Sequence, residues 1–266
     1  IRAYKTLNVK RKKLMDFQEK LAHLKFLDPA CGSGNFLTET YLSLRRLENK
    51  VLRVLYGEGQ GVLGVAASDI IKVSIQQFYG IEINDFAVTV AKTALWIAES
   101  QMLDETKNII YGLDGDFLPL KTYVNITEGN ALKIDWNSVV SANELSYIMG
   151  NPPFVGHKNV SIEQKEDMKR IFNNKQGRLD YVSAWYLLAS RYIQNSKIEC
   201  GFVSTNTVVQ GTHLESLWYT LLNNYHLKIN FAYNTFKWES EASQKAAVFC
   251  VIIGFSLVDK KEKLLF

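Results

Sequence analysis

The turn Gly150-Asn151-Pro152-Pro153-Phe154 combines groups that could hold a planar amine. The apolar run 147–149 that precedes it is typical of a buried strand. Two prolines fix φ and remove two backbone donors, so the strand must end here with carbonyl groups directed outward. The turn therefore offers the Asn151 side-chain oxygen, the Pro152 carbonyl and the flat Phe154 ring to one ligand. A plain strand-terminating turn is the alternative interpretation.

A glycine-rich turn lies upstream, between the apolar stretch 26–28 and a long helical pattern. A Gly-x-Gly turn at Gly32 and Gly34 lets backbone approach a small ligand at the carboxyl edge of an open sheet. Leu37 stands where the dinucleotide fingerprint has its third glycine, which disfavours nicotinamide binding. Asp28 suits the cationic amino group of a methionine moiety better than it suits a pyrophosphate.

Glu82 lies near the end of the stretch 77–83, where the second strand should emerge from the sheet. A carboxylate has two acceptor oxygens and can accept hydrogen bonds from two ribose hydroxyls. A strand-end acid that faces solvent is the alternative. We favour the ligand role.

These stretches together resemble class I S-adenosylmethionine-dependent methyltransferases that modify exocyclic amines, above all DNA adenine-N6 methyltransferases. More narrowly, the chain is similar to the methyltransferase region of MmeI-like type II restriction-modification enzymes. The segments that carry this resemblance are 26–37, 79–83, 129–132, 150–156, 179–186 and 245–255.

The resemblance implies S-adenosylmethionine as the cofactor and DNA as the partner, with no metal. The implied cofactor-binding residues are Asp28, Ala30, Gly32, Gly34, Asn35, Phe36, Glu82, Ile83, Asn130 and Ala131, with Asp180 at the rim of the pocket. The implied catalytic residues are Asn151, Pro152, Pro153 and Phe154.

Methylation of adenine N6 in a duplex requires that the base be flipped out, at a cost of a few kcal/mol. Stacking on an aromatic face returns roughly 1–3 kcal/mol, so we expect Phe154 to stack on the target base. Phe236 and Trp238 are candidates to close that pocket from an edge, or else belong to a hairpin core. Methylation of cytosine C5 is disfavoured, because the turn holds no cysteine nucleophile.

The charge pattern is compatible with DNA binding. The 266 residues carry 31 basic and 27 acidic side chains, for a net charge of +4. Basic residues form the run 10–13 and gather again between Lys158 and Arg178, next to the proposed target pocket. We expect the second group, with Lys158, to contact phosphates, while a solvated helix face is the alternative for the first.

The three cysteines, Cys31, Cys200 and Cys250, are widely spaced and are interpreted as buried thiols of a cytoplasmic protein. No apolar run approaches the roughly 20 residues that a membrane span needs.

Alternating strand and helix patterns predict an α/β fold, a doubly wound, Rossmann-like, mainly parallel seven-stranded sheet with an antiparallel C-terminal hairpin. The expected strands cover 25–29, 77–83, 123–131, 145–150, 200–205, 227–236 and 246–255. The expected helices cover 1–25, 34–56, 84–98, 180–193 and 211–223, with 101–122 irregular and 236–238 in a turn. We expect residues 1–24 to be a helical extension and 25–266 to be the methyltransferase domain.

Several functions share an Asn-Pro-Pro-aromatic turn. Methyltransferases for cytosine N4, rRNA bases or protein glutamine also present a planar amine, and a catalytically inactive DNA-binding module is a non-enzymatic alternative. Because the first residue is Ile1 and not a methionine, we expect a longer parent chain that carries the target-recognition region and, in a restriction enzyme, a nuclease.

Overall fold

The computed structural model describes residues 2–57, 66–113, 125–175, 177–238 and 248–266. These residues form an α/β fold around one eight-stranded sheet with the order β3-β2-β1-β4-β5-β7-β6-β8. The strands are β1 (Phe26–Asp28), β2 (Phe78–Glu82), β3 (Ile126–Glu128), β4 (Tyr147–Gly150), β5 (Glu199–Thr205), β6 (Lys228–Trp238), β7 (Val248–Ser256) and β8 (Leu264–Leu265). Strands β1 to β5 are parallel, and β7 is antiparallel to both of its neighbours. The predicted fold class is confirmed, and β8 adds a short edge strand to the seven expected.

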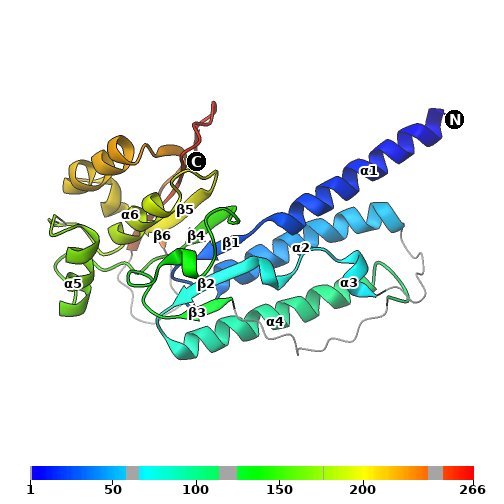
Figure 1. Ribbon diagram of the computed structural model, residues 1–266, viewed down its shortest axis with the longest axis horizontal. Helices are drawn as coiled ribbons and strands as arrows, with labels where there is room; N and C mark the ends of the chain where they lie inside the picture. Colours follow the sequence, from blue (N-terminus) through cyan, green and yellow to red (C-terminus); the bar gives the residue numbers. More distant parts are fainter. Residues whose placement is uncertain (1, 58–65, 114–124, 176, 239–247) are drawn as a thin grey trace.

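The α-helices lie in the part of the chain that precedes β5. The α-helices are α1 (Arg2–His23), α2 (Asn35–Tyr56), α3 (Ala67–Ile70), α4 (Asp85–Lys107), α5 (Ile162–Ile171) and α6 (Ser183–Tyr192). Short 3₁₀ turns are η1 (Ile75–Gln77), η2 (Trp136–Ser138) and η3 (Asn206–Val209), and η4 (Leu214–Trp218) and η5 (Thr220–Asn224) are π-helical. Helix α1 is the predicted N-terminal helix, and its first turns project away from the sheet (Figure 1). No helix among the described residues is long and apolar enough to cross a membrane.

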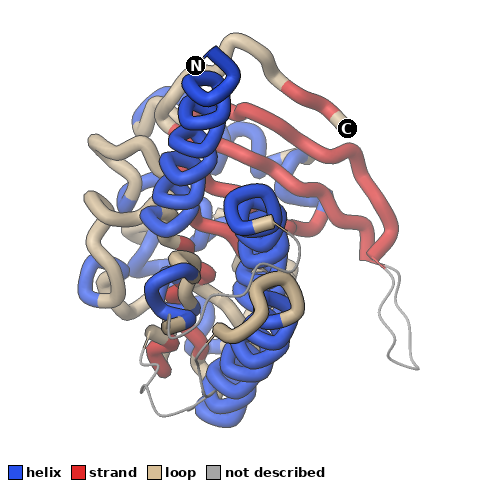
Figure 2. Tube along the Cα trace, turned by 90° about the vertical axis from the view of Figure 1, so that its right-hand side faces the viewer, coloured by secondary structure: helices blue, strands red, loops and turns tan. Residues whose placement is uncertain are grey.

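Both faces of the sheet are covered, as the strand sequences require. In β1, Phe26 packs with α2 and α4 residues on one face, whereas the next residue, Leu27, packs with α6 residues on the other. Successive side chains of a strand point to opposite faces, so two apolar neighbours demand two apolar layers. Figure 2 shows the C-terminal strands in red, running side by side next to the helices of the N-terminal half. The three cysteines are buried free thiols, as predicted.

Two expectations about the elements were wrong. Helix α4 continues through residues 101–107, which we expected to be irregular, because Met102 and Thr106 extend the buried stripe begun by Val88 and Leu95. The remainder of that expected segment includes 114–122, which lies outside the described residues, as do residues 123 and 124 of the third expected strand.

The second error concerns the hairpin. Phe236 and Trp238 belong to β6 and not to a turn, since they pair with Cys250 and Val248 of β7. Thr205, the last residue of β5, also pairs with Cys250. The hairpin therefore extends past the end of β5, at the edge of the sheet where the parallel strands end.

A buried ion pair fixes α2 to its neighbours. Arg45 and Glu48 are 1% and 0% exposed and form a salt bridge within α2. The Glu48 carboxylate also accepts hydrogen bonds from the backbone of Lys72 (2.7 Å) and the side chain of Gln18 (2.7 Å). Arg45 donates to the Thr106 hydroxyl of α4 (2.8 Å). The charges are thus compensated inside a network that joins α1, α2 and α4.

Removing one partner of this pair should destabilise the fold. Glu48→Ala leaves a buried guanidinium without its counter-charge, and we expect a loss of about 3–5 kcal/mol in the free energy of unfolding. Glu39→Ala is the matched control, since Glu39 of α2 pairs with Arg46 at the surface and should lose less than about 1 kcal/mol. Urea unfolding followed by circular dichroism measures both, and equal losses would contradict a special role for the buried pair.

Candidate active site

The loops that follow β1, β2, β3 and β4 meet at one edge of the sheet. Parallel strands place their carboxyl ends together, which is where open α/β sheets bind ligands. A cavity of about 470 Å³ lies at this edge. Its lining residues come from these loops and from α5 and α6: Pro29, Ala30, Ile81, Glu82, Ile83, Gly129, Asn130, Ala131, Asn151, Pro153, Ser161, Glu163, Gln164, Asp167, Tyr181 and Trp185. The structure thus brings Ala30, Glu82, Ile83, Asn130 and Ala131 together with the turn 150–154, which we call the catalytic turn after the role predicted for it.

The Gly-x-Gly turn packs tightly on the start of α4. Gly34 has φ +83°, and a Cβ atom added to it would lie 2.9 Å from the Ala91 side chain, so only glycine fits here. The Cys31 N–H donates to the Ile81 carbonyl of β2 (3.1 Å), and the Gly34 N–H donates to the Cys31 carbonyl (2.8 Å). These bonds hold the turn against the neighbouring strand and leave its outer side toward the ligand.

Glu82 is oriented by backbone groups on either side of it. One carboxylate oxygen accepts from the Gly32 N–H (2.9 Å) and the other from the Asn84 N–H (2.9 Å). A carboxylate can accept about four hydrogen bonds, so capacity for two hydroxyl donors remains. The same two bonds fix the distance between the glycine-rich turn and the loop that follows β2.

Asp28 is the last residue of β1, just before the glycine-rich turn, and is 1% exposed. Its Oδ1 accepts from the Ala30 N–H (3.0 Å). Burial, with a smaller contribution from the nearby Glu82 charge, raises the pKa of Asp28 from 3.8 to about 7. A carboxylate in this position favours a neighbouring cation, because a positive group would relieve both effects.

Asp28 also constrains the strand beside it. A Cβ atom on Gly150 would lie 2.5 Å from Asp28 Oδ1. The residue that precedes Asn151 must therefore lack a side chain, and the acid and the catalytic turn are in direct contact through β1 and β4.

The catalytic turn presents an acceptor that has no partner. Asn151 Oδ1 is buried and makes no hydrogen bond, and Asn151 lines the cavity together with Pro153. Pro152 is buried and Phe154 is half-buried. A buried carbonyl oxygen without a donor costs about 1–3 kcal/mol, which indicates a site that awaits a ligand donor.

Asn130 is held by groups that the sequence did not reveal. Its Nδ2 donates to Asp167 of α5 (2.8 Å), and its Oδ1 accepts from the Leu132 N–H (2.8 Å). Asp167 is 3% exposed and also accepts from the Tyr181 hydroxyl (3.3 Å). The Asn130 amide is therefore fixed in orientation at the cavity wall.

Helices α5 and α6 supply the lining residues that sequence reasoning missed. Trp185 donates to the Pro29 carbonyl (3.1 Å) and packs edge-on against Tyr181, with ring centroids 5.3 Å apart. Tyr181 and Trp185 lie in the segment 179–186 that supported the family resemblance, but the sequence predicted no role for either residue. Helix α5 begins at a capping box between Ser161 and Gln164, and the Ser-x-x-Gln spacing could have located this helix.

The cavity is not lined by the other predicted residues, which are Asp28, Gly32, Gly34, Asn35, Phe36, Pro152, Phe154, Lys158, Asp180, Phe236 and Trp238. Asn35 and Phe36 form the first turn of α2. Lys158 is exposed on the loop that follows the catalytic turn. Phe236 and Trp238 are 6.3 Å apart between ring centroids on the extended hairpin.

Asp180, predicted to lie at the rim of the cofactor pocket, makes its hydrogen bonds to other loops. It does not line the cavity. Its carboxylate accepts hydrogen bonds from the His157 N–H (3.0 Å) and the Thr207 hydroxyl (2.6 Å). Asp180 therefore holds loops together next to the cavity.

Comparisons with known proteins agree with this arrangement. The family model described as "MmeI, DNA-methyltransferase domain" matches residues 4–266. DNA methyltransferase A of Bacillus subtilis is 44% identical over 253 residues, which cover 94% of this chain and 28% of the relative. The chain therefore spans less than a third of that relative's length.

Solved structures show the same likeness. The type IIL restriction-modification enzyme MmeI in complex with DNA is 45% identical, has a TM-score of 0.90 and is matched over 98% of this chain and 35% of its own. The DNA-bound type ISP enzyme LlaBIII, at 15% identity and a TM-score of 0.56, shares the fold over 89% of this chain and 17% of its own. The chain belongs to the MmeI DNA-methyltransferase domain family.

Proposed function

We propose that this chain transfers a methyl group from S-adenosylmethionine to the N6 amine of a flipped-out adenine in DNA, as the modification part of a restriction-modification enzyme. The observation that carries the proposal is the partnerless buried Asn151 Oδ1 on the wall of the cavity. Family membership and the 45% identity to MmeI, a protein solved with DNA, support the substrate. Adenine as the target base rests on the resemblance of the catalytic turn.

The residues at the cavity fit S-adenosylmethionine. Asp28 would pair with the amino group of its methionine part, and Glu82 would accept from the ribose hydroxyls. Ile83 and Ala131 would form apolar walls beside the adenine ring, near the fixed amide of Asn130. When bound, the cofactor supplies an activated methyl group next to the catalytic turn.

The catalytic turn would activate the amine by position and electrostatics. An aromatic amine is a poor nucleophile because its lone pair is delocalised into the ring. Asn151 Oδ1 and the Pro152 carbonyl would each accept one N–H bond of the amine, which favours a pyramidal nitrogen and directs its lone pair. No covalent bond to the protein is required.

The remaining predictions describe how DNA would be held. Phe154 would stack on the flipped base, Phe236 and Trp238 would close the pocket from the hairpin, and Lys158 would contact a phosphate. The cytoplasmic location, and recognition and nuclease regions in a longer parent chain, also stay predictions.

The first test of the cofactor site uses Asp28→Asn. In the wild type we expect S-adenosylmethionine affinity to rise from pH 6 to pH 8, because the Asp28 pKa of about 7 leaves the carboxyl group largely neutral at the lower pH. The variant should bind about 10- to 100-fold more weakly at pH 8, since a hydrogen bond to a charged group contributes about 1.5–3 kcal/mol, and its affinity should lose this pH dependence. Calorimetric titration measures both, with Asp69→Asn, an exposed acid in α3, as the control.

The same variant should stabilise the empty protein. Folding raises the Asp28 pKa from 3.8 to about 7, so its charge destabilises the fold increasingly as pH rises through that interval. We expect Asp28→Asn to be more stable than the wild type by a few kcal/mol at pH 8 and not at pH 4, since one pKa unit corresponds to about 1.4 kcal/mol. Thermal unfolding at the two pH values tests this, and an unchanged difference would show that Asp28 is not strained by burial.

A second test separates chemistry from cofactor binding. Asn151→Ala removes the side-chain acceptor, and we expect single-turnover methyl transfer to DNA with an unpaired adenine to fall by about 10²-fold or more. Cofactor affinity should stay within about threefold, because the interaction matters mainly in the transition state. Asn151→Asp keeps an acceptor oxygen at this position and is the matched control. If both variants lost equal activity, the acceptor role of the side-chain oxygen would be wrong.

A further inference from the structure

Asp180 joins three segments that arrive from different strands. Its Oδ1 accepts from the His157 N–H (3.0 Å), three residues after Phe154, and its Oδ2 accepts from the Thr207 hydroxyl (2.6 Å) in the loop after β5. Its own N–H donates to Nε2 of His213 (3.0 Å). The chain that follows the catalytic turn is thereby tied to the next loop of the same sheet edge.

The next residues extend this connection to the cofactor loop. The Tyr181 N–H donates to the Val155 carbonyl (2.9 Å), so two successive residues hold the segment after Phe154. One turn later, Trp185 donates to the Pro29 carbonyl of the glycine-rich loop (3.1 Å). The residues from Asp180 to Trp185 therefore connect the loop after β4 to the loop after β1. Methyl transfer depends on the relative position of these two loops, because one would hold the target amine and the other the cofactor.

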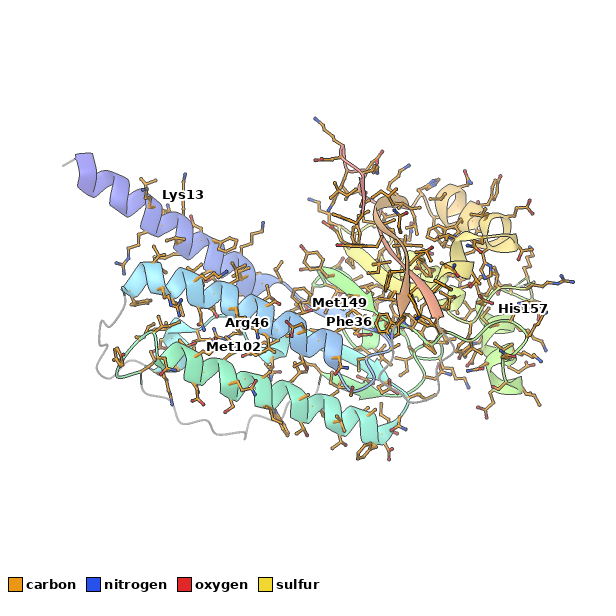
Figure 3. All side chains as sticks on the ribbon, turned by 180° about the vertical axis from the view of Figure 1, so that it is seen from behind. Lys13, Phe36, Arg46, Met102, Met149 and His157 are labelled. Carbon is orange, nitrogen blue, oxygen red and sulfur yellow. The ribbon has the colours of Figure 1, made fainter. Side chains whose placement is uncertain are left out.

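The protonation state of His213 is consistent with its hydrogen bond to the Asp180 N–H. His213 is 6% exposed, and burial lowers its pKa below 6.5, so its Nε2 remains an acceptor for the Asp180 N–H. His157 is half-exposed, and its Nδ1 lies 3.9 Å from Asp180 Oδ1. His157 lies at the end of the molecule opposite Lys13 of α1 (Figure 3).

Burying a carboxylate is costly unless hydrogen bonds compensate it. Asp180 is 6% exposed, and both oxygens accept from groups in loops that are not otherwise constrained by a strand ladder. An apolar side chain could fill the same space, but it could not hold the His157 N–H and the Thr207 hydroxyl in fixed positions.

We infer that Asp180 is a positioning residue that sets the catalytic turn relative to the bound cofactor, and that it acts on methyl transfer and not on cofactor affinity. This inference rests on the proposed function and replaces the rim role predicted from the sequence. The carboxylate holds the segment 155–157 in place, and this segment continues directly from the residues that grip the target amine.

The test compares Asp180→Ala with Asp180→Asn. Loss of both acceptors should slow single-turnover methyl transfer about 10²-fold, the scale expected for a misplacement of about 1 Å, with S-adenosylmethionine affinity within about threefold of the wild type. Hydrogen exchange at the His157 amide should become at least about tenfold faster. Asp180→Asn keeps an acceptor for the His157 N–H and should recover most of the rate and the protection.

Thr207→Val offers a milder change should Asp180→Ala fail to fold, because Thr207 is exposed and only the bonds of its hydroxyl, to Asp180 and with the Thr205 hydroxyl (2.8 Å), are lost. We expect a rate loss of about threefold to tenfold without a change in cofactor affinity. Thr93→Val is the control, since this exposed threonine also donates a side-chain hydrogen bond, but to Thr89 within α4 (2.9 Å).

The outcomes separate the inference from the proposed function. A wild-type chain that binds no S-adenosylmethionine would overturn the proposed function, while the exchange measurement would still test the contact. Asp180→Ala with weakened cofactor binding in proportion to its lost rate would return Asp180 to the cofactor site. Unchanged exchange and an unchanged rate would overturn the positioning role.

Discussion

The contact between Asp28 and Gly150 is the constraint on which the site depends. The two residues end adjacent parallel strands, and a Cβ atom at position 150 would lie 2.5 Å from Asp28 Oδ1, so a larger residue there would have to displace the buried carboxylate. The buried acid of the cofactor loop and the first residue of the catalytic turn therefore occupy one packed unit. Any shift of β4 along β1 would force the carboxylate to move or the catalytic turn to open.

Two buried groups near the site oppose folding. Asp28 is buried without a counter-charge, which raises its pKa to about 7, and Asn151 Oδ1 is buried without a donor. Both groups would be satisfied by a ligand that brings a cation to one and an N–H to the other. A buried polar group that is kept without its partner at a cavity, as Asn151 is, is typical of a functional site, because selection maintains it against its cost in stability.

Sequence reasoning predicted seven of the eight strands and located the glycine-rich turn and the turn 150–154, because Gly32, Gly34 and the prolines leave local signals. It missed the continuation of α4, where polar residues near Glu99 interrupt the apolar pattern although Met102 is buried. It also missed Asp167 and the contacts of Asp180, because their partners are 14–37 and 23–33 residues away in sequence, and no local pattern encodes such bonds. Residues that act through tertiary hydrogen bonds require coordinates.

The loops of the site are linked to one another by backbone groups. The Cys31 N–H reaches the Ile81 carbonyl, and the Gly129 N–H reaches the Glu82 carbonyl (2.8 Å). On the other side, Trp185 of α6 binds the loop after β1, and Tyr181, two residues before α6, binds the loop after β4. The buried network around Glu48 also fixes α2, the helix that begins at the glycine-rich turn. This turn is therefore restrained by its bond to β2 and by the fixed position of α2. The site is therefore held as one framework in which the loop positions depend on each other, and this explains why a side chain outside the cavity can govern the geometry inside it.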